Sequence, residues 1–513
     1  LKLFLYCKAC KSERGNQNRE FDMPSYILTI DQGTTGTTVL LLDQSGSVVK
    51  SVYSEFRQYY PQSGWVEHDA QEIWTATQKL IKQILSETGT RANEVRAVGI
   101  TNQRETTVLW DRKTGEPLHH AIVWQCRRTS RMCEQLKEQG LEPLFRERTG
   151  LILDAYFSGT KLKWLFDHIP GTRERAAKGE ICFGTIDSWL IYKLTGGKQH
   201  VTDMTNASRT LLYNIFDKTW DEELLEVLDI PRECLPEVFN SSAEFGRSDL
   251  SELPGIPITG VAGDQQAALY GQNCWEPGLI KNTYGTGCFI VMNTGEQPIE
   301  SAHHLLTTLA CDAHGKPCYA LEGSVFMAGA VVQWMRDIGL IASAAETGEI
   351  SKAVNDTNGV VLVPAFVGLG APHWDSNARG IITGLTRGAG REHIVRAGLE
   401  SIAYQSWDVM QSMVADSHIQ IKELRVDGGA AANDFLMQFQ ADLLNITVER
   451  PTIIETTALG AAFLAGIGAN FWTPSDIESI RKVDRQFTPS MAQRHRLEKL
   501  KAWKNAVERC KNR

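Results

Sequence analysis

Residues 26–42 read YILTIDQGTTGTTVLLL, which is an apolar run, a turn rich in Gly and Thr, and a second apolar run. The runs predict buried strands over 26–30 and 38–42, and a third strand is expected over 47–53. The turn 31–38 holds more Gly and Thr than a simple hairpin needs. Glycine lets the backbone approach a phosphate closely, and Thr hydroxyls and backbone N–H groups donate to its oxygens. We interpret this turn as a phosphate-handling loop, with a tight polar hairpin as the alternative.

Two strand ends in the first half of the chain carry polar residues. Asp31 could hold Mg²⁺ through water molecules, because carboxylate oxygens suit that cation. A helix capped by Asp69 precedes an expected strand over 95–101, which runs into Arg104 and Glu105. An adjacent Arg and Glu can bind neighbouring hydroxyls, and a surface ion pair is the alternative. Strands that end in polar residues and alternate with helices favour an α/β domain with its site at the strand ends.

A third strand end follows in the middle of the chain. An expected strand over 256–261 leads into Gly263, Asp264 and two glutamines, which open a helix. Taken alone, a carboxylate at a helix start is a cap. Beside the other strand ends, Asp264 is the best candidate for a general base that takes the proton of an attacking hydroxyl.

A second strand–turn–strand unit echoes the first. Residues 279–283 and 289–292 predict strands, and the turn between them contains Thr286 and Gly287. The first turn, at residues 31–38, is not a Walker A loop, since Gly-Lys-Ser/Thr is missing. We interpret the echo as an internal duplication that produces two domains of similar fold facing each other.

The remaining expectations concern the second half. A helix is expected after Gly323, within residues 321–335. Residues 424–427 predict a strand that ends in a Gly-Gly turn, and Asn433 opens the next helix. A Gly-Gly turn lets a flat ring or a phosphate lie close to the backbone, while an ordinary strand–helix turn is the alternative. An amphipathic surface helix is expected over 494–507.

Composition limits the class of protein. The 513 residues have a formal net charge of −8, which disfavours nucleic acid or an anionic membrane as main partner. No run of about 20 apolar residues predicts a transmembrane helix. Eleven scattered cysteines suit reduced thiols, and a zinc site at Cys7 and Cys10 is disfavoured because no second pair follows. We interpret residues 1–22 as a disordered or mis-annotated leader and Met23 as the start.

Several stretches in this order carry a resemblance, and they cover nearly all of residues 24–472. They include IDQGTTGTT, ITNQRETTVLW, IVWQCRRT, TDMTNASRTLLYNI, GVAGDQQAALYGQ, KNTYGTGCF and VDGGAAANDF. They resemble the FGGY carbohydrate kinases, within the superfamily of ATPases that also holds actin, hexokinase and the heat-shock chaperones. The resemblance implies an α/β fold of two ribonuclease H-like (actin-like ATPase) domains facing a central cleft. It puts the polyol site and phosphate loop in residues 23–272 and the nucleotide site in residues 273–513.

Within the family, NQRETT, VWQCRR and GDQQAALYGQ are most similar to members that phosphorylate glycerol. The resemblance implies that the polyol hydroxyls contact Arg104, Glu105, Tyr156, Asp264 and Gln265, and that its carbon edge packs on Trp124 and Phe289. It implies that the nucleotide contacts Thr34, Thr35, Gly36, Thr286, Gly329, Gln333, Gly429 and Asn433. It makes Asp264 the catalytic base and puts Asp31 and Asp264 near Mg²⁺, through water.

The reaction implied by the resemblance is transfer of the ATP γ-phosphoryl group to glycerol, which gives sn-glycerol 3-phosphate and ADP. This is the step by which glycerol enters catabolism. The cofactors implied are ATP and Mg²⁺, and the location implied is the cytoplasm. A homodimer or homotetramer is expected, without a nucleic acid partner and without membrane insertion.

Two departures from the family pattern stand out. Many relatives that act on glycerol carry Arg at the end of the first loop, where this chain has Thr38. A contact between a guanidinium and a phosphate is therefore absent, or another cation supplies it. Members inhibited by fructose 1,6-bisphosphate have a Gly-rich loop where this chain has residues 246–254, so we expect weak or no inhibition. Strong inhibition of initial rates at sub-millimolar ligand would contradict that expectation.

Three alternatives remain at this point. One is a family kinase for another polyol or a ketose such as xylulose. Another is an actin-like or chaperone-like ATPase that uses nucleotide to switch partners and needs no polyol pocket. The third is a catalytically weak homologue with a regulatory role, which Thr38 keeps open.

Overall fold

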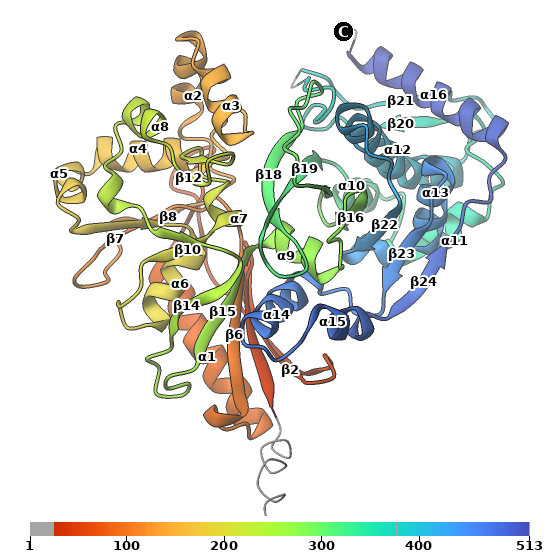
Figure 1. The fold of residues 1–513 in the computed structure, drawn as a ribbon. Helices are drawn as coiled ribbons and strands as arrows, with labels where there is room; N and C mark the ends of the chain where they lie inside the picture. The colour runs from red at the N-terminus through yellow and green to blue at the C-terminus, as the bar shows by residue number, and fades with distance from the viewer. Residues whose placement is uncertain (1–24, 376, 512–513) are drawn as a thin grey trace, which may run out of the picture.

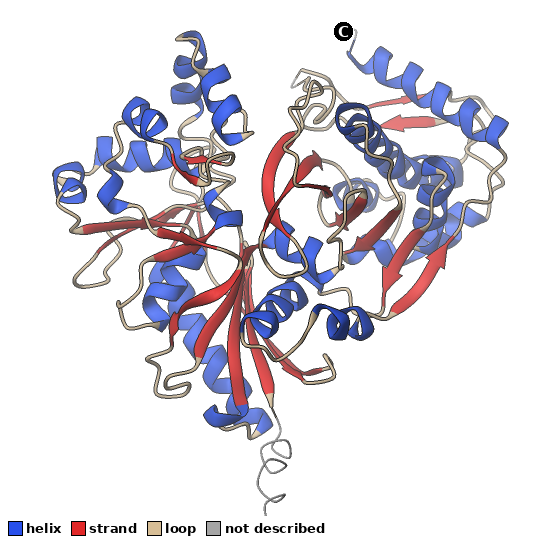
Figure 2. Cartoon of the chain, in the orientation of Figure 1, coloured by secondary structure: helices blue, strands red, loops and turns tan. Residues whose placement is uncertain are grey.

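The computed structural model describes residues 25–375 and 377–511, which form two α/β domains side by side (Figure 1). Each domain is built on a mixed β-sheet flanked by helices (Figure 2). The α/β fold class expected from the sequence is thus confirmed. The leader predicted over residues 1–22, the start at Met23, and Cys7 with Cys10 lie outside the described residues.

The first sheet has the strand order β14-β15-β6-β1-β2-β3. The expected meander is present as three antiparallel strands, β1 (Tyr26–Gln32), β2 (Gly36–Asp43) and β3 (Val48–Glu55). Two strands run parallel to β1, namely β6 (Val95–Asn102) and β15 (Pro257–Gly263), and β14 (Ser242–Arg247) closes the edge. Because β1, β6 and β15 are parallel neighbours, their carboxyl ends meet at one edge of the sheet.

The second sheet has the order β18-β19-β17-β16-β22-β23-β24. Its antiparallel part is β16 (Leu279–Tyr284), β17 (Cys288–Gly295), β19 (Pro317–Val325) and β18 (Leu306–Cys311). Parallel to β16 run β22 (Glu423–Asp427) and β23 (Val448–Pro451), and β24 (Val483–Phe487) closes the edge. The order β19-β17-β16-β22-β23 repeats β3-β2-β1-β6-β15, which confirms the internal duplication.

The predicted helix starts at Asp69 and Asn433 are confirmed. The Asp69 carboxylate accepts the N–H of Gln71 at 2.8 Å and begins α1 (Ala70–Thr88). The Asn433 side chain accepts the N–H of Leu436 at 3.1 Å and begins α13 (Asp434–Leu444). As expected, α9 (Asp264–Gly271) starts at Asp264, and the chain closes with α16 (Gln493–Lys511).

The helix expected after Gly323, within residues 321–335, is present, but Gly323 itself lies in a strand. The strand β19 continues through Gly323 to Val325, and α10 (Gly329–Asp337) begins only at Gly329. A Cβ at Gly323 would lie 2.5 Å from Cγ1 of Val409, on α12 (Arg391–Ser417). This glycine therefore allows close packing of a strand on a helix and does not mark a helix start.

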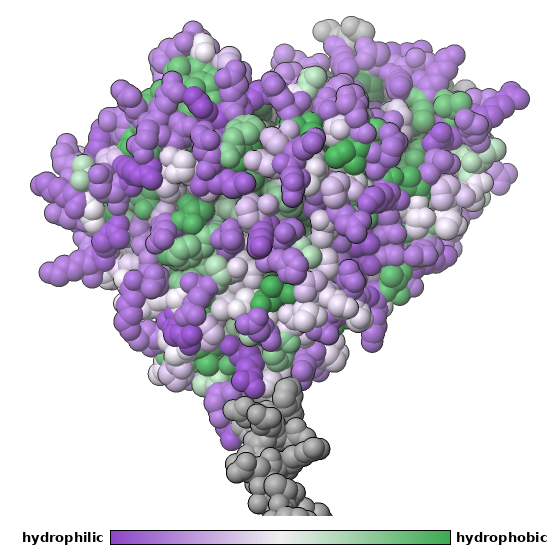
Figure 3. Space-filling model, in the orientation of Figure 1, coloured by the Kyte–Doolittle hydropathy of each residue, from purple (hydrophilic) through white to green (hydrophobic). Residues whose placement is uncertain are grey.

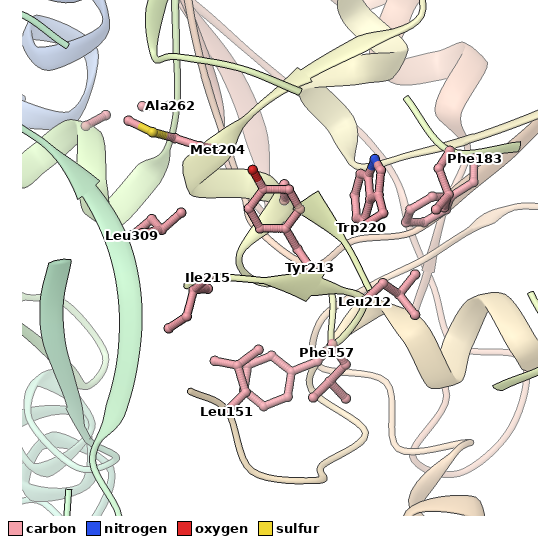
Figure 4. Packing of buried hydrophobic residues seen from close by; sticks show 14 of the residues in the cluster. Leu151, Phe157, Phe183, Met204, Leu212, Tyr213, Ile215, Trp220, Ala262 and Leu309 are labelled. Carbon is pink, nitrogen blue, oxygen red and sulfur yellow. The ribbon is translucent and has the colours of Figure 1, made fainter. Parts of the chain in front are cut away.

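Two segments from the second half of the chain pack against the first domain. Helix α14 (Thr456–Gly468) lies on the first sheet (Figure 1), so close that a Cβ at Gly260 would be 2.2 Å from the Ala465 nitrogen. Strand β18 places Leu309 in one apolar cluster with Met204, Tyr213 and Ile215 (Figure 4). The seam between the domains is therefore a packed core over part of its length.

Other helices complete the layers. They are α2 (Ser130–Glu138), α3 (Glu142–Thr149), α4 (Ser158–His168), α5 (Thr172–Ala177), α6 (Ile186–Leu194), α7 (Met204–Ala207), α8 (Glu222–Leu228), α11 (Thr347–Lys352) and α15 (Pro474–Ile480). The short strands are β4 (Gln58–Tyr59), β5 (Glu67–His68), β7 (Val108–Asp111), β8 (Ala121–Ile122), β9 (Ile181–Gly184), β10 (Val201–Asp203), β11 (Tyr213–Asn214), β12 (Thr219–Trp220), β13 (Glu237–Phe239), β20 (Val361–Val363) and β21 (Ile381–Thr383). The face drawn in Figure 3 is mainly hydrophilic, with apolar residues in small separate areas. In the described ranges, no helix combines the length and the apolar character that a membrane span requires.

Candidate active site

The three polar strand ends predicted from the sequence meet at one edge of the first sheet. Asp31 on β1 pairs with Thr101 on β6, and Ala262 on β15 pairs with the same Thr101. The chain continues from β6 into Arg104 and Glu105, and from β15 into Asp264. Strand pairing alone thus brings together residues that lie far apart in the sequence.

A cluster of five charged side chains fills this edge. Arg104 places Nε 3.1 Å from Oδ1 of Asp264 and Nη1 2.6 Å from Oε2 of Glu322. Arg209 places Nε 2.7 Å from Oε1 of Glu105 and Nη2 3.0 Å from Oε1 of Glu322. We call Arg104, Glu105, Arg209, Asp264 and Glu322 the charge cluster. Alternating signs at these distances satisfy charges that would be costly to bury alone.

Exposure separates the three carboxylates of the charge cluster. The side chains of Glu105 and Glu322 are 1% exposed, whereas that of Asp264 is 34% exposed. Asp264 is therefore the carboxylate of the charge cluster that is most open to an incoming hydroxyl. The position of this carboxylate fits the general base expected from the sequence.

Two donors of the charge cluster remain unused. Nε of Arg104 and Nη1 of Arg209 are buried and have no hydrogen-bond acceptor among the described residues, although Nε of Arg104 lies near Asp264. Buried donors of this kind are costly unless a ligand supplies oxygen atoms. The charge cluster can therefore donate two hydrogen bonds to the hydroxyl oxygens of a small molecule.

Aromatic residues form a wall beside the charge cluster. The rings of Trp124 and Tyr156 meet edge to face at 5.5 Å between centroids, and the Arg209 guanidinium lies 5.7 Å from the Tyr156 ring. Burial raises the pKa of the Tyr156 phenol, so its hydroxyl remains a donor. Phe289 is half-buried on β17 and pairs with Ser324 of β19, two residues from Glu322, so its side chain shares a sheet face with Glu322.

Buried side chains fix the backbone of Glu105, which has φ +61°, a conformation that non-glycine residues rarely adopt. Oγ of Ser158 donates to the Glu105 carbonyl at 3.0 Å, and Nζ of Lys161 donates to it at 3.4 Å. Lys161 also donates to the carbonyl of Tyr156. Burial lowers the pKa of Lys161 to about 8. One buried amine thus positions two of the predicted polyol-binding residues.

The predicted phosphate loop is held by its own backbone and by a neighbouring amide. The N–H of Gly33 donates to the carbonyl of Gly36 at 2.9 Å, and Nε2 of Gln58 donates to the carbonyl of Thr34 at 3.0 Å. Thr35 is exposed, while Oγ1 of Thr34 accepts Nε1–H of Trp124 at 3.0 Å. Gly36 lies under the Tyr53 ring, since a Cβ there would be 2.4 Å from it.

Asp31 begins the phosphate loop and interacts electrostatically with Asp264 of the charge cluster. Burial, and secondly the charge of Asp264, raise the pKa of Asp31 to about 7. Thr38 pairs directly with Asp31 and supplies no cation. Asp264 pairs with Arg104, whereas Asp31 has no ion-pair partner among the described residues, and a carboxylate of this kind suits a divalent metal. Within the described ranges, no group of three or more His, Cys, Asp or Glu side chains could hold a metal ion.

The second domain contains a separate open cavity of about 880 Å³, which we call the second-domain cavity. Five of the predicted nucleotide-binding residues line it, namely Thr286, Gly329, Gln333, Gly429 and Asn433. Their backbones interlock, because the Gly329 N–H donates to the Gly285 carbonyl at 3.0 Å. Nδ2 of Asn433 donates to Oγ1 of Thr347 at 3.0 Å across the cavity wall. A cavity of this size fits a nucleoside.

Gln265 connects the edge of the first sheet with the second domain. Gln265 accepts a hydrogen bond from the buried Lys281 of β16. Arg209, Glu322, Lys161 and Lys281 received no role from the sequence. Arg209 lies in the TDMTNASRTLLYNI stretch, where a lone Arg could have been noticed, but nothing local distinguishes Glu322.

A family of known proteins matches both halves of the chain. The FGGY family of carbohydrate kinases matches over residues 26–271 for its N-terminal domain and over residues 280–469 for its C-terminal domain. A glycerol kinase of Petrotoga mobilis is 57% identical over 96% of this chain and 99% of that protein. A glycerol kinase 2 of Thermotoga maritima is 56% identical over 94% of this chain and 98% of that protein.

Solved structures give the same result for the fold. A Plasmodium falciparum glycerol kinase with ADP superposes with a TM-score of 0.91 at 38% identity, over 95% of this chain and 98% of that one. A xylulose kinase from Lactobacillus acidophilus superposes with a TM-score of 0.85 at 23% identity, over 94% of this chain and 97% of that one. The second likeness concerns the fold alone.

Proposed function

Since this chain belongs to the FGGY family of carbohydrate kinases, we propose that it phosphorylates glycerol with ATP as the phosphoryl donor. Relatives named glycerol kinase match it at more than half of all positions over nearly its full length. The observation that carries the proposal is the charge cluster: Arg104 and Glu105 are buried beside Asp264, which alone among its carboxylates is accessible.

The proposed chemistry uses few groups of the protein. Glycerol hydroxyls would accept from the unused Nε of Arg104 and Nη1 of Arg209 and donate to Glu105. Trp124 and Phe289 would cover the carbon edge. Asp264 would take the proton of the terminal hydroxyl as that oxygen attacks the γ-phosphorus of ATP and the bond to the ADP oxygen breaks. The products are sn-glycerol 3-phosphate and ADP.

The second-domain cavity would bind the nucleoside part of ATP. Its backbone groups around Gly329 and Gly429 would lie against the base and sugar, and Thr286 would face the phosphates. Thr34 and Thr35 would donate to the phosphates from the first domain. Mg²⁺, held through water by Asp31 and Asp264, would neutralise phosphate charge.

The cellular setting is part of the proposal. The eight cysteines from Cys126 to Cys318 are buried and form no disulfide, which suits a reducing compartment, so we place the enzyme in the cytoplasm. There it would carry out the step by which glycerol enters catabolism, as a homodimer or homotetramer. This oligomeric state comes by resemblance alone.

A substrate panel tests the function. ADP formation should be measured with ATP and Mg²⁺ in the presence of glycerol, xylulose, gluconate or no acceptor. We expect saturable ADP formation with glycerol, at least 100-fold above the rate without acceptor. A higher kcat/KM for xylulose would indicate the ketose alternative, and equal rates with and without glycerol would indicate an ATPase.

A further inference from the structure

We propose that Glu322, on β19 of the second domain, is a positioning residue that orients Arg104 and Arg209 for the polyol, so that the polyol site is complete only while β18 and β19 are docked on the first domain. The proposal rests on the proposed function. It goes beyond that function because it makes Glu322, which has no part in the proposed chemistry, the residue that orients both arginines.

The geometry of Glu322 is that of a two-sided clamp. Its Oε2 accepts Nη1 of Arg104 at 2.6 Å, and its Oε1 accepts Nη2 of Arg104 at 3.0 Å and Nη2 of Arg209 at 3.0 Å. The pairing with Arg104 is bidentate, which fixes the plane of the guanidinium as well as its position. All three side chains are at most 1% exposed, so water cannot replace these contacts.

The clamp decides which donors remain for a ligand. Glu322 occupies both Nη atoms of Arg104, and Gln266 accepts a second bond from Nη1 at 3.1 Å, which leaves Nε. Arg209 uses Nε for Glu105 and Nη2 for Glu322, which leaves Nη1. The two donors without an acceptor are therefore selected by Glu322.

The two arginines keep the Glu322 carboxylate ionised. Burial alone would raise the pKa of Glu322, but Arg104 and then Arg209 hold it down to about 2. Glu322 is thus ionised at every pH at which the protein would be assayed. Without its charge, two buried guanidinium groups would share the single buried carboxylate of Glu105 and the partly exposed Asp264, and both would be free to turn.

Further contacts across the seam show that this edge depends on docking of the second domain. Nε2 of Gln266 donates to Oγ1 of Thr308 at 3.3 Å and to the Leu309 carbonyl at 3.2 Å, both on β18. Lys281 of β16 donates to Gln265. In contrast, the second-domain cavity is lined only by residues from Tyr284 onward. Loosening of the seam should therefore impair polyol binding and leave nucleotide binding intact.

The test is Glu322→Gln in the full chain, assayed for KM of glycerol, KM of ATP and kcat. Loss of a charge-assisted clamp should raise the KM of glycerol about 10- to 100-fold, while the KM of ATP stays within twofold. Glu322→Asp keeps the charge but shortens the reach, so we expect an intermediate KM of glycerol, at least fivefold raised. The matched control is Glu449→Gln, which removes another buried carboxylate paired with Arg, at Arg481 in the second domain. It should lower thermal stability and leave both KM values unchanged.

The outcomes separate the possibilities. A KM of glycerol within threefold of the wild type in Glu322→Gln would overturn the proposal, as would equal increases in both KM values. If Glu322→Gln does not fold, Glu322→Asp decides by its fivefold criterion. If neither folds, Glu322 is a structural residue and the proposal fails. Absence of glycerol-dependent turnover in the wild type would instead contradict the proposed function.

Discussion

The charge cluster and the second-domain cavity differ in how they can recognise a ligand. The charge cluster is closed, with Arg104, Glu105, Arg209 and Glu322 at most 1% exposed, and its polar atoms are fixed by one another. The cavity is an open space of about 880 Å³, and glycines such as Gly329 and Gly429 let its backbone come close to a ligand. A small polyol offers only hydroxyl groups, so buried polar partners must supply affinity and selectivity. A nucleoside is large, so shape and close backbone approach suffice.

The difference predicts that variants at the two places should separate kinetically. The largest effect is expected for Asp264→Asn. Asparagine keeps the shape of the residue but cannot take a proton, so kcat should fall about 100- to 10,000-fold. ADP affinity, measured by calorimetric titration, should stay within twofold, because Asp264 does not line the second-domain cavity. A kcat within tenfold of the wild type would contradict the role of general base.

The next effect should appear at the nucleotide. A Cβ at Gly329 would lie 2.7 Å from the Gly285 carbonyl oxygen and would push the turn that carries Thr286. Gly329→Ala should therefore raise the KM of ATP about tenfold, an order-of-magnitude expectation for a displaced backbone contact. Glycerol binding should not change. An increase in the KM of glycerol of the same size would show that the two places are not separate.

A third effect is expected at Thr38, which lies beside Asp31 in the phosphate loop. Its side chain shares a sheet face with Asp31, because the two residues pair directly across β1 and β2. Thr38→Arg should lower the pKa of Asp31 and attract phosphate, so we expect the KM of ATP to fall about fivefold. Thr38→Gln has a similar reach without charge and should change nothing. Equal effects of both substitutions would contradict an electrostatic cause.

The smallest effect concerns the free energy of unfolding and comes from the buried amine of Lys161. The pKa of Lys161 is lowered to about 8, so between pH 8 and about 10.4 the unfolded chain holds a proton that the folded protein has released. Lys161 should therefore contribute a rise of about 1 kcal/mol in the free energy of unfolding between pH 8 and pH 9. The buried thiols, whose pKa values are raised, act in the opposite direction, so the contribution of Lys161 is read from the difference between the wild type and Lys161→Met in denaturant titrations at both pH values. That difference should shift by about 1 kcal/mol in favour of the wild type from pH 8 to pH 9, whereas the difference between the wild type and the exposed-site control Lys137→Met should stay constant. The same constant difference for Lys161→Met would contradict the assignment.

The sequence predicted the strand ends because they are local features. Asp31, Arg104 and Asp264 each follow an apolar run, and parallel pairing then brings them together. The helix N-caps at Asp69 and Asn433 could be predicted for the same reason. The repeated Gly/Thr turn was enough to predict the duplicated sheet.

The rest depends on contacts between distant residues. Glu322 meets Arg104 across 218 positions, and within its own strand it resembles a solvent-facing residue. Its partner Arg209 and the buried Lys161 acquire their roles only from three-dimensional packing. The place of Gly323 inside β19 has a similar origin, because this glycine allows close packing of β19 on α12.

The most direct measurement is a ³¹P NMR spectrum of a mixture of the wild-type protein with ATP, Mg²⁺ and glycerol. We expect a phosphomonoester resonance of glycerol 3-phosphate that grows in a one-to-one ratio with ADP, while inorganic phosphate stays near its starting level. Growth of inorganic phosphate without any phosphomonoester would contradict the proposed kinase and favour an ATPase.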